Sequence, residues 1–153
     1  MNIGGKELAH GIIQGGMGVG VSLSNLAGSV AREGCMGVIS SVNIGFEEPD
    51  FLENPFEANI RALKEHIKKA KEISQGKGLI GVNIMVAVSH YEETVKAAIE
   101  AGADAIISGA GLPLNLAELV KKMTTGSEQV FRGHHTFFLP LLITDMRRKP
   151  LKC

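Results

Sequence analysis

The chain has 153 residues, enough for one domain with a buried core, and 44% of them are hydrophobic. Sixteen Lys and Arg balance sixteen Asp and Glu, so charge gives no reason to expect a nucleic acid or an anionic membrane as partner. Cys35 and Cys153 are too few for a disulfide framework. No apolar stretch reaches the ~18 residues of a membrane span and no secretory leader is evident. We therefore expect a cytoplasmic location.

The first candidate site follows an apolar run at residues 11–14, which leads directly into Gly15-Gly16-Met17-Gly18. A short hydrophobic run bounded by glycine is typical of a strand buried on both faces. Glycine has no Cβ, so the main chain of such a turn can approach a flat ring or a phosphate closely. The sequence predicts a strand at 11–14 and a ligand-binding turn after it. The alternative is a turn that only permits tight packing of a strand against a helix.

Strands and helices alternate along residues 12–120. Predicted strands span residues 11–14, 37–41, 79–86 and 105–108, and predicted helices cover about 23–32, Asn54 to Gly76, Ser89 to Gly102, and a stretch from Asn115. Two helix starts have a capping residue three positions before a glutamate, at Asn54 and Ser89. Recurring βα units predict a parallel sheet, either closed as a TIM-type barrel or open and doubly wound.

The pattern changes after residue 121. Residues 122–153 hold six basic and two acidic residues, and residues 137–143 form an apolar cluster. We expect residues 1–121 to form one half of a barrel and residues 122–153 to be an irregular, aberrant tail, as a frameshift or truncation produces. The apolar cluster either covers an open sheet edge or promotes aggregation, and an open edge favours self-association of two copies.

Three motifs stand in order, each at the C-terminal end of a predicted strand: Gln14-Gly15-Gly16-Met17-Gly18, Gly81-Val82-Asn83-Ile84-Met85 and Ile107-Ser108-Gly109-Ala110-Gly111-Leu112-Pro113. Together they resemble the FMN-dependent nitronate monooxygenases, formerly called 2-nitropropane dioxygenases, and their relatives, the FMN-dependent enoyl-acyl-carrier-protein reductases. The resemblance covers about residues 1–121. It implies a (β/α)8 barrel with FMN at its C-terminal mouth, of which this chain holds about four of the eight units.

The resemblance also implies six cofactor-contacting residues at the strand ends: Gly16, Met17, Gly18, Asn83, Ser108 and Gly109. Main-chain amides and the Asn83 carboxamide suit the polar edge of FMN, and the Met17 side chain offers a soft apolar surface. Two alternatives stay open. Asn83 is otherwise a buried amide that bonds a neighbouring strand, and the turn at Ser108 is otherwise a plain βα connection.

For activity, the resemblance implies oxidative denitrification of an alkyl nitronate with O2. The alternatives are reduction of an enoyl thioester and a non-catalytic α/β binding module. The family's Ala-Gly-Gly-His-type motif, which carries the catalytic histidine, and its phosphate-binding glycines have no counterpart here. Arg132-Gly133-His134-His135 has the wrong flanks, so we assign no catalytic residue and expect impaired turnover and weak FMN binding. We expect no metal site, and we interpret Cys35 as a core thiol.

Overall fold

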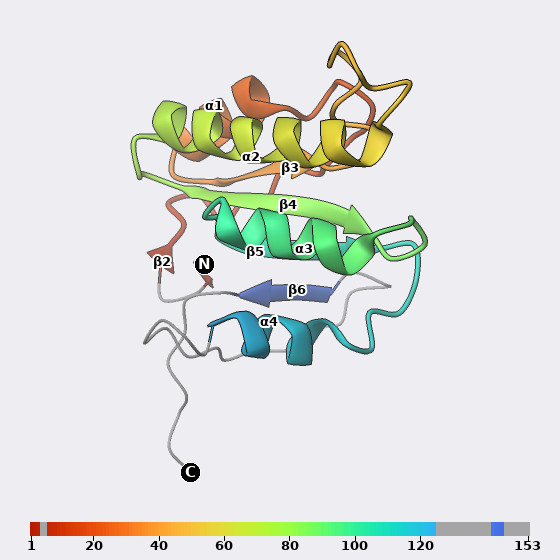
Figure 1. The fold of residues 1–153 in the computed structure, drawn as a ribbon. Helices are drawn as coiled ribbons and strands as arrows, with labels where there is room; N and C mark the ends of the chain where they lie inside the picture. Colours follow the sequence, from red (N-terminus) through yellow and green to blue (C-terminus); the bar gives the residue numbers. More distant parts are fainter. Residues whose placement is uncertain (4–5, 125–141, 146–153) are drawn as a thin grey trace.

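The computed structural model describes residues 1–3, 6–124 and 142–145 (Figure 1). Its elements, in chain order, are β1 (Asn2–Ile3), β2 (Lys6–Glu7), α1 (Ser24–Arg32), β3 (Met36–Ser40), α2 (Pro55–Ser74), β4 (Leu79–Met85), α3 (Tyr91–Glu100), β5 (Ala105–Gly109), α4 (Leu116–Thr124) and β6 (Leu142–Asp145). The strands β1 and β2 form a short antiparallel hairpin. From α1 to α4, strands and helices alternate as the sequence predicts.

The main sheet has the strand order β3-β4-β5-β6. The first three strands are parallel, and their register places Ser40 beside Asn83 and Asn83 beside Ile107. This alternation of parallel strands and helices is consistent with part of a TIM-barrel-like fold. The strand β6 runs antiparallel to β5, so the tail, which we expected to be irregular, contains one strand. Most of the apolar cluster at 137–143 lies outside the described residues.

The two faces of the sheet have different coverings. Side chains that alternate along the strands form one large cluster with residues of α1, α2, α3 and α4, and Ile39, Val82 and Ile106 lie at its centre. The helices α2 and α3 lie along this face in Figure 1. The opposite face carries a smaller cluster that includes Val38 and Ile107 and is covered by residues from the N-terminal segment. We call these the helix face and the inner face.

The predicted strand at residues 11–14 is wrong, because the segment makes only a single parallel bridge between Ile13 and Met36. Its backbone exchanges two hydrogen bonds with Met36, one from the Gln14 N–H at 2.9 Å and one to the Ile12 carbonyl at 3.0 Å. Beyond this point the Gln14 side chain replaces the main chain as the partner of β3, because its Oε1 accepts a hydrogen bond from the Val38 N–H at 2.9 Å. A side chain therefore continues the ladder where the backbone turns away.

The helix boundaries follow the predictions more closely than the caps do. Asn54 is the N-cap residue of α2, but its side chain makes no capping hydrogen bond. The N-cap of α3 is His90, in the left-handed conformation with φ of 60°, and not the predicted Ser89. At the other end of α3, Gly102 takes a φ of 87°, as expected of a glycine that ends a helix.

The N-terminal edge of the sheet is held by Asp104, just before β5. Its carboxylate is almost fully buried, accepts a hydrogen bond from the Ile80 N–H at 2.8 Å and lies 2.5 Å from Lys71 Nζ. One side chain therefore joins α2, β4 and the start of β5. Cys35, the residue before β3, is buried, which agrees with its interpretation as a core thiol.

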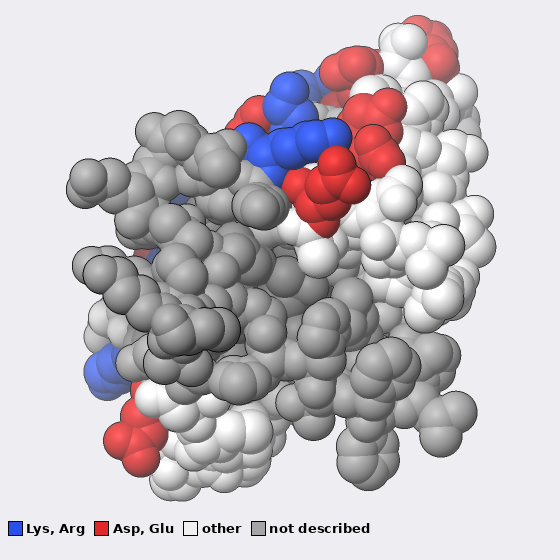
Figure 2. All heavy atoms as spheres, turned by 90° about the horizontal axis from the view of Figure 1, so that it is seen from below, with Lys and Arg blue, Asp and Glu red and all other residues white. Residues whose placement is uncertain are grey.

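Charged side chains are mixed on the surface. Arg61 pairs with both Glu48 and Asp50, and Lys64 on α2 pairs with Glu100 on α3 at 3.0 Å. Figure 2 shows basic and acidic side chains next to one another on the face seen from below. Within the part of the chain that the structure describes, no helix is long and apolar enough to cross a membrane.

Candidate functional site

The C-terminal ends of β3 and β4 meet the glycine turn that follows Gln14. Asn83 on β4 points to the inner face, and its Nδ2 donates a hydrogen bond to the Gly16 carbonyl at 3.3 Å. Ser40 lies beside Asn83 in the strand register, and a Cβ added at Gly18 would meet the Ser40 Oγ first, at 3.0 Å. We call the surface formed by Gly16, Gly18, Ser40, Asn83 and Gly109 the mouth. Sequence motifs 67 residues apart, at Gly16 and Asn83, are thus in direct contact.

The glycine turn is held in shape by Ser22, just before α1. Its Oγ accepts hydrogen bonds from the Met17 N–H at 2.9 Å and from Gln14 Nε2 at 3.0 Å, and it donates to the Gly15 carbonyl at 3.3 Å. Its own backbone carbonyl accepts the Ser40 N–H at 2.9 Å. Ser22 is buried, so one hydroxyl fixes both the turn and its distance from β3.

Glycine is required at Gly16 by close approach. A Cβ at that position would stand 2.7 Å from the Asn83 Cβ and 3.2 Å from Val38 Cγ1. At Gly18 a Cβ would stand 3.0 Å from Ser40 Oγ. The neighbouring Gly15 differs, because a Cβ there would meet nothing within 4 Å. The turn therefore packs tightly against the strand ends at Gly16 and Gly18, whereas Gly15 has free space around its Cα.

The mouth presents polar groups that have no partner among the described residues. The N–H groups of Gly16 and Gly18 donate to nothing there, and the Asn83 Oδ1 accepts nothing. Ser40 is a buried residue, and its hydroxyl makes no hydrogen bond within the described ranges; since no buried side-chain oxygen there lacks a partner, this hydroxyl is open at the surface of the mouth. In contrast, the Met17 N–H is already donated to Ser22, while the Met17 side chain is 62% exposed. The mouth thus offers donors and an acceptor on one surface, and Met17 in the adjoining turn has an exposed apolar side chain.

The two remaining predicted residues lie on different faces. The Ser108 side chain is fully buried on the helix face, and its Oγ lies 2.6 Å from the Tyr91 hydroxyl. Burial of the Tyr91 side chain itself raises the pKa of its phenol, and the bond to Ser108 acts in the opposite direction. The Ser108 side chain therefore does not line the mouth. Gly109, one residue later, is on the inner side beside Met85, and a Cβ there would meet nothing within 4 Å.

Sequence reasoning missed Ser40 and Ser22. Ser40 is the last residue of β3, the strand before the one that carries Asn83. Binding residues of barrels lie at the C-terminal ends of parallel strands, so Ser40 could have been predicted on that basis. Ser22 gave no such signal, because its role depends on how the glycine turn folds back. Its partner Gln14 was quoted within a motif, but its side-chain bond to Val38 is a feature of tertiary structure.

The described residues contain neither a metal centre nor an obvious general base at the mouth. No group of three or more His, Cys, Asp or Glu in these ranges could hold a metal ion. His66 lies on α2, where its Nδ1 is 3.0 Å from Ser24 Oγ, and burial lowers its pKa. His90 begins α3 on the helix side. His134 and His135 lie outside the described residues.

A parallel βα sheet with main-chain amides and a carboxamide at its carboxyl edge is consistent with part of a TIM-barrel-like fold, in which such an edge is the usual place of the site. The family comparison makes this specific: residues 3–127 match the nitronate monooxygenase family, and the chain belongs to it. Members of that family are flavin-dependent. No curated protein matches the chain. The predicted family is confirmed, and an oxidoreductase function of the flavin-dependent kind follows from it.

Proposed function

We propose that the mouth binds the isoalloxazine ring of FMN and that the chain is a nitronate monooxygenase-type oxidoreductase. The observation that carries the proposal is the contact between Gly16 and Asn83, with a donated bond of 3.3 Å. This contact brings the first two motifs of the family resemblance to one surface. Both residues keep a polar group without a partner among the described residues, as a flavin site requires.

The residues present fit the polar edge of a flavin ring. Asn83 is oriented by its bond to Gly16, so its Oδ1 remains an acceptor for a ring N–H. The N–H groups of Gly16 and Gly18 are donors for a ring carbonyl, and the absence of a Cβ lets the ring come close. The Met17 side chain is exposed and supplies an apolar contact.

When bound, FMN supplies the electron transfer that the chain's own side chains do not provide. The chain's contribution is to bind the ring, to orient it through Asn83 and to exclude water on the side of the inner face. The substrate we propose is an alkyl nitronate, whose oxidation with O2 releases nitrite. No described residue at the mouth favours an enoyl thioester over it.

The first experiment measures flavin binding by the purified chain. We expect added FMN to show quenched fluorescence and a shifted absorbance band near 450 nm, because a ring in a protein site leaves bulk water. Asn83→Ala removes both the acceptor and the bond to Gly16, and loss of such a group costs about 1–3 kcal/mol, or roughly 5- to 150-fold in affinity. Asn25→Ala, on the exposed side of α1, is the matched control.

The outcome that contradicts the proposal is equal FMN affinity for the parent chain, Asn83→Ala and Asn25→Ala. A chain that gives no spectral change at millimolar FMN contradicts it as well. Riboflavin in place of FMN separates ring binding from phosphate binding. Because the proposed contacts are all to the ring, we expect riboflavin and FMN to bind this chain with similar affinity.

A further inference from the structure

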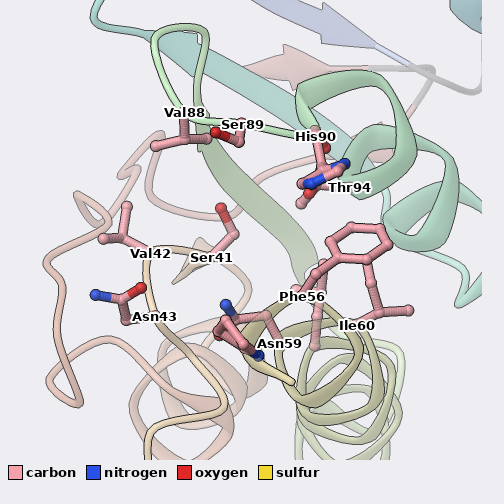
Figure 3. Close-up of a pocket in the computed structure, with 12 residues that line it drawn as sticks. Ser41, Val42, Asn43, Phe56, Asn59, Ile60, Val88, Ser89, His90 and Thr94 are labelled. Atoms are coloured by element: carbon pink, nitrogen blue, oxygen red, sulfur yellow. The ribbon is translucent and has the colours of Figure 1, made fainter. Parts of the chain in front are cut away.

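A cavity lies between the loop after β3, the helix α2 and the start of α3 (Figure 3). It has a volume of about 430 Å³, which is within the range of small-molecule sites. Its walls come from the loop after β3, the first turns of α2 and the loop that leads from β4 into α3. Neither the family motifs nor the proposed flavin site uses these segments.

Ser41 marks this cavity as a polar site. Its side chain is 8% exposed and points into the cavity in Figure 3. The Ser41 N–H donates to the Asn83 carbonyl at 3.1 Å, which fixes the residue to β4. Its hydroxyl makes no hydrogen bond within the described part of the chain. No buried side-chain oxygen or nitrogen of the described residues lacks a partner, so this hydroxyl is open to the cavity, where it can bond a ligand.

The opposite wall offers a flat apolar surface. The rings of Phe56 on α2 and His90 at the start of α3 lie with their centroids 4.2 Å apart and their planes at 31°. Ile60 and Leu63 continue this wall along α2, and Val88 closes it from the β4–α3 loop. His90 reaches this place because its backbone takes the left-handed conformation. The body of a ring-shaped ligand fits against such a wall.

Ser41 and Asn59 define one hydrogen-bonding edge, and Asn43, Ser89 and Thr94 are further polar residues of the lining. Asn59 Oδ1 accepts the Gly45 N–H at 2.8 Å, so the orientation of the amide is set and its Nδ2 is left as a donor. Together with the Ser41 hydroxyl, this edge can donate to a carbonyl and accept from an N–H. No Asp, Glu, Lys or Arg lines the cavity. His90 is the one ionisable side chain among the lining residues, and its Nδ1 lies 3.7 Å from Glu93, which already offers it an opposite charge. A charged ligand would therefore lose its hydration without gaining a dedicated partner.

We propose that this cavity binds a small uncharged organic molecule with a ring-shaped apolar body and a carboxamide-like edge. The edge bonds to Ser41 and Asn59, and the body packs against Phe56 and Val88. Ser40 points to the inner face, whereas Ser41, the next residue, lines the cavity, and Val42 both lines the cavity and lies beside Gly18 of the mouth. The cavity therefore adjoins the mouth but uses none of the proposed flavin contacts, so the proposal stands if flavin binding fails.

Benzamide is the probe that tests the proposal, with benzoate and toluene as its charged and apolar counterparts. Ligand-observed NMR titrations on the full chain give the three affinities. We expect benzamide to bind in the millimolar range, which is usual for a ligand of this size, and to bind at least about 5-fold more tightly than benzoate or toluene. Ser41→Ala should weaken benzamide by about 5-fold and leave toluene unchanged.

Two further variants keep the test decisive. Ser29→Ala, at an exposed position on α1, is the control that should leave all three affinities unchanged. Ser89→Trp, on the exposed loop at the cavity rim, should block all binding and also serves if Ser41→Ala folds poorly. Equal binding of benzamide and toluene overturns the proposal. So does benzamide binding that survives both Ser41→Ala and Ser89→Trp, because the molecule then lies elsewhere.

Discussion

Replacement of Gly16 by alanine tests the packing on which the mouth depends. The added Cβ would stand 2.7 Å from the Asn83 Cβ, whereas ordinary contacts begin at 3.4 Å, so the two segments must separate by about 0.7 Å. Asn83 cannot retreat, because its strand is paired on both sides. The glycine turn has to move instead, and the 3.3 Å bond from Asn83 to Gly16 is the first to lengthen.

The magnitude follows from two contributions. Overpacking costs about 1–3 kcal/mol, and loss of the hydrogen bond costs about 1 kcal/mol. For a chain of this size, each kcal/mol lowers the Tm by about 2–4 °C, so we expect Gly16→Ala to lower it by ~4–16 °C. Thermal unfolding followed by circular dichroism measures the shift.

Gly15→Ala is the matched control for this experiment. A Cβ at Gly15 meets nothing within 4 Å, so we expect the free energy of unfolding to change by no more than about 0.5 kcal/mol. If both variants melt at the same temperature, the contact between Gly16 and Asn83 does not exist in solution. The mouth as described would then be refuted.

Three further predictions concern stability. Gly37→Ala should prevent folding, because its Cβ would overlap a backbone carbonyl of α1, whereas Gly109→Ala, which meets nothing within 4 Å, should fold normally; circular dichroism of the two purified variants checks this. Asp104→Asn should lower the free energy of unfolding by about 3 kcal/mol, because it weakens the buried hydrogen bond from the Ile80 N–H and removes the charge that pairs with Lys71. Urea denaturation measures this loss of stability. His66 has a lowered pKa in the folded chain, so below about 6.5, its ordinary value, the unfolded chain binds more protons and stability falls as the pH falls. His66→Gln should flatten this dependence, and unchanged urea midpoints across pH 5–8 in the parent chain would contradict the assignment.

The order of strands and helices could be predicted because periodicity and glycine stops carry that information locally. The helix from Pro55 and the strand from Leu79 begin where the pattern places them. The strand at residues 11–14 was predicted for the same reasons and is wrong. Its ladder depends on the Gln14 side chain reaching Val38, and a local pattern contains nothing about that contact.

The sequence could predict which strand ends form the candidate site, but not to which face of the sheet each side chain points. Asn83 was assigned to the mouth and points there, whereas the Ser108 side chain points to the helices. Successive residues of a strand face opposite sides, so the choice depends on register, and register is set by pairing between strands. The cavity beside Ser41 could not be predicted at all. It forms where two loops meet the start of α2, and the shape of these loops follows from packing and not from periodicity.

Asp104 holds together α2, β4 and β5 at the end of the sheet opposite the mouth. The two ends of the strands therefore have different roles. Because Asp104 stabilises the fold at one end, the loops at the other end can change in shape and chemistry without loss of the sheet. Engineering of new ligand preference in this chain should therefore begin with the turns after the strands, and should leave the carboxylate before β5 untouched.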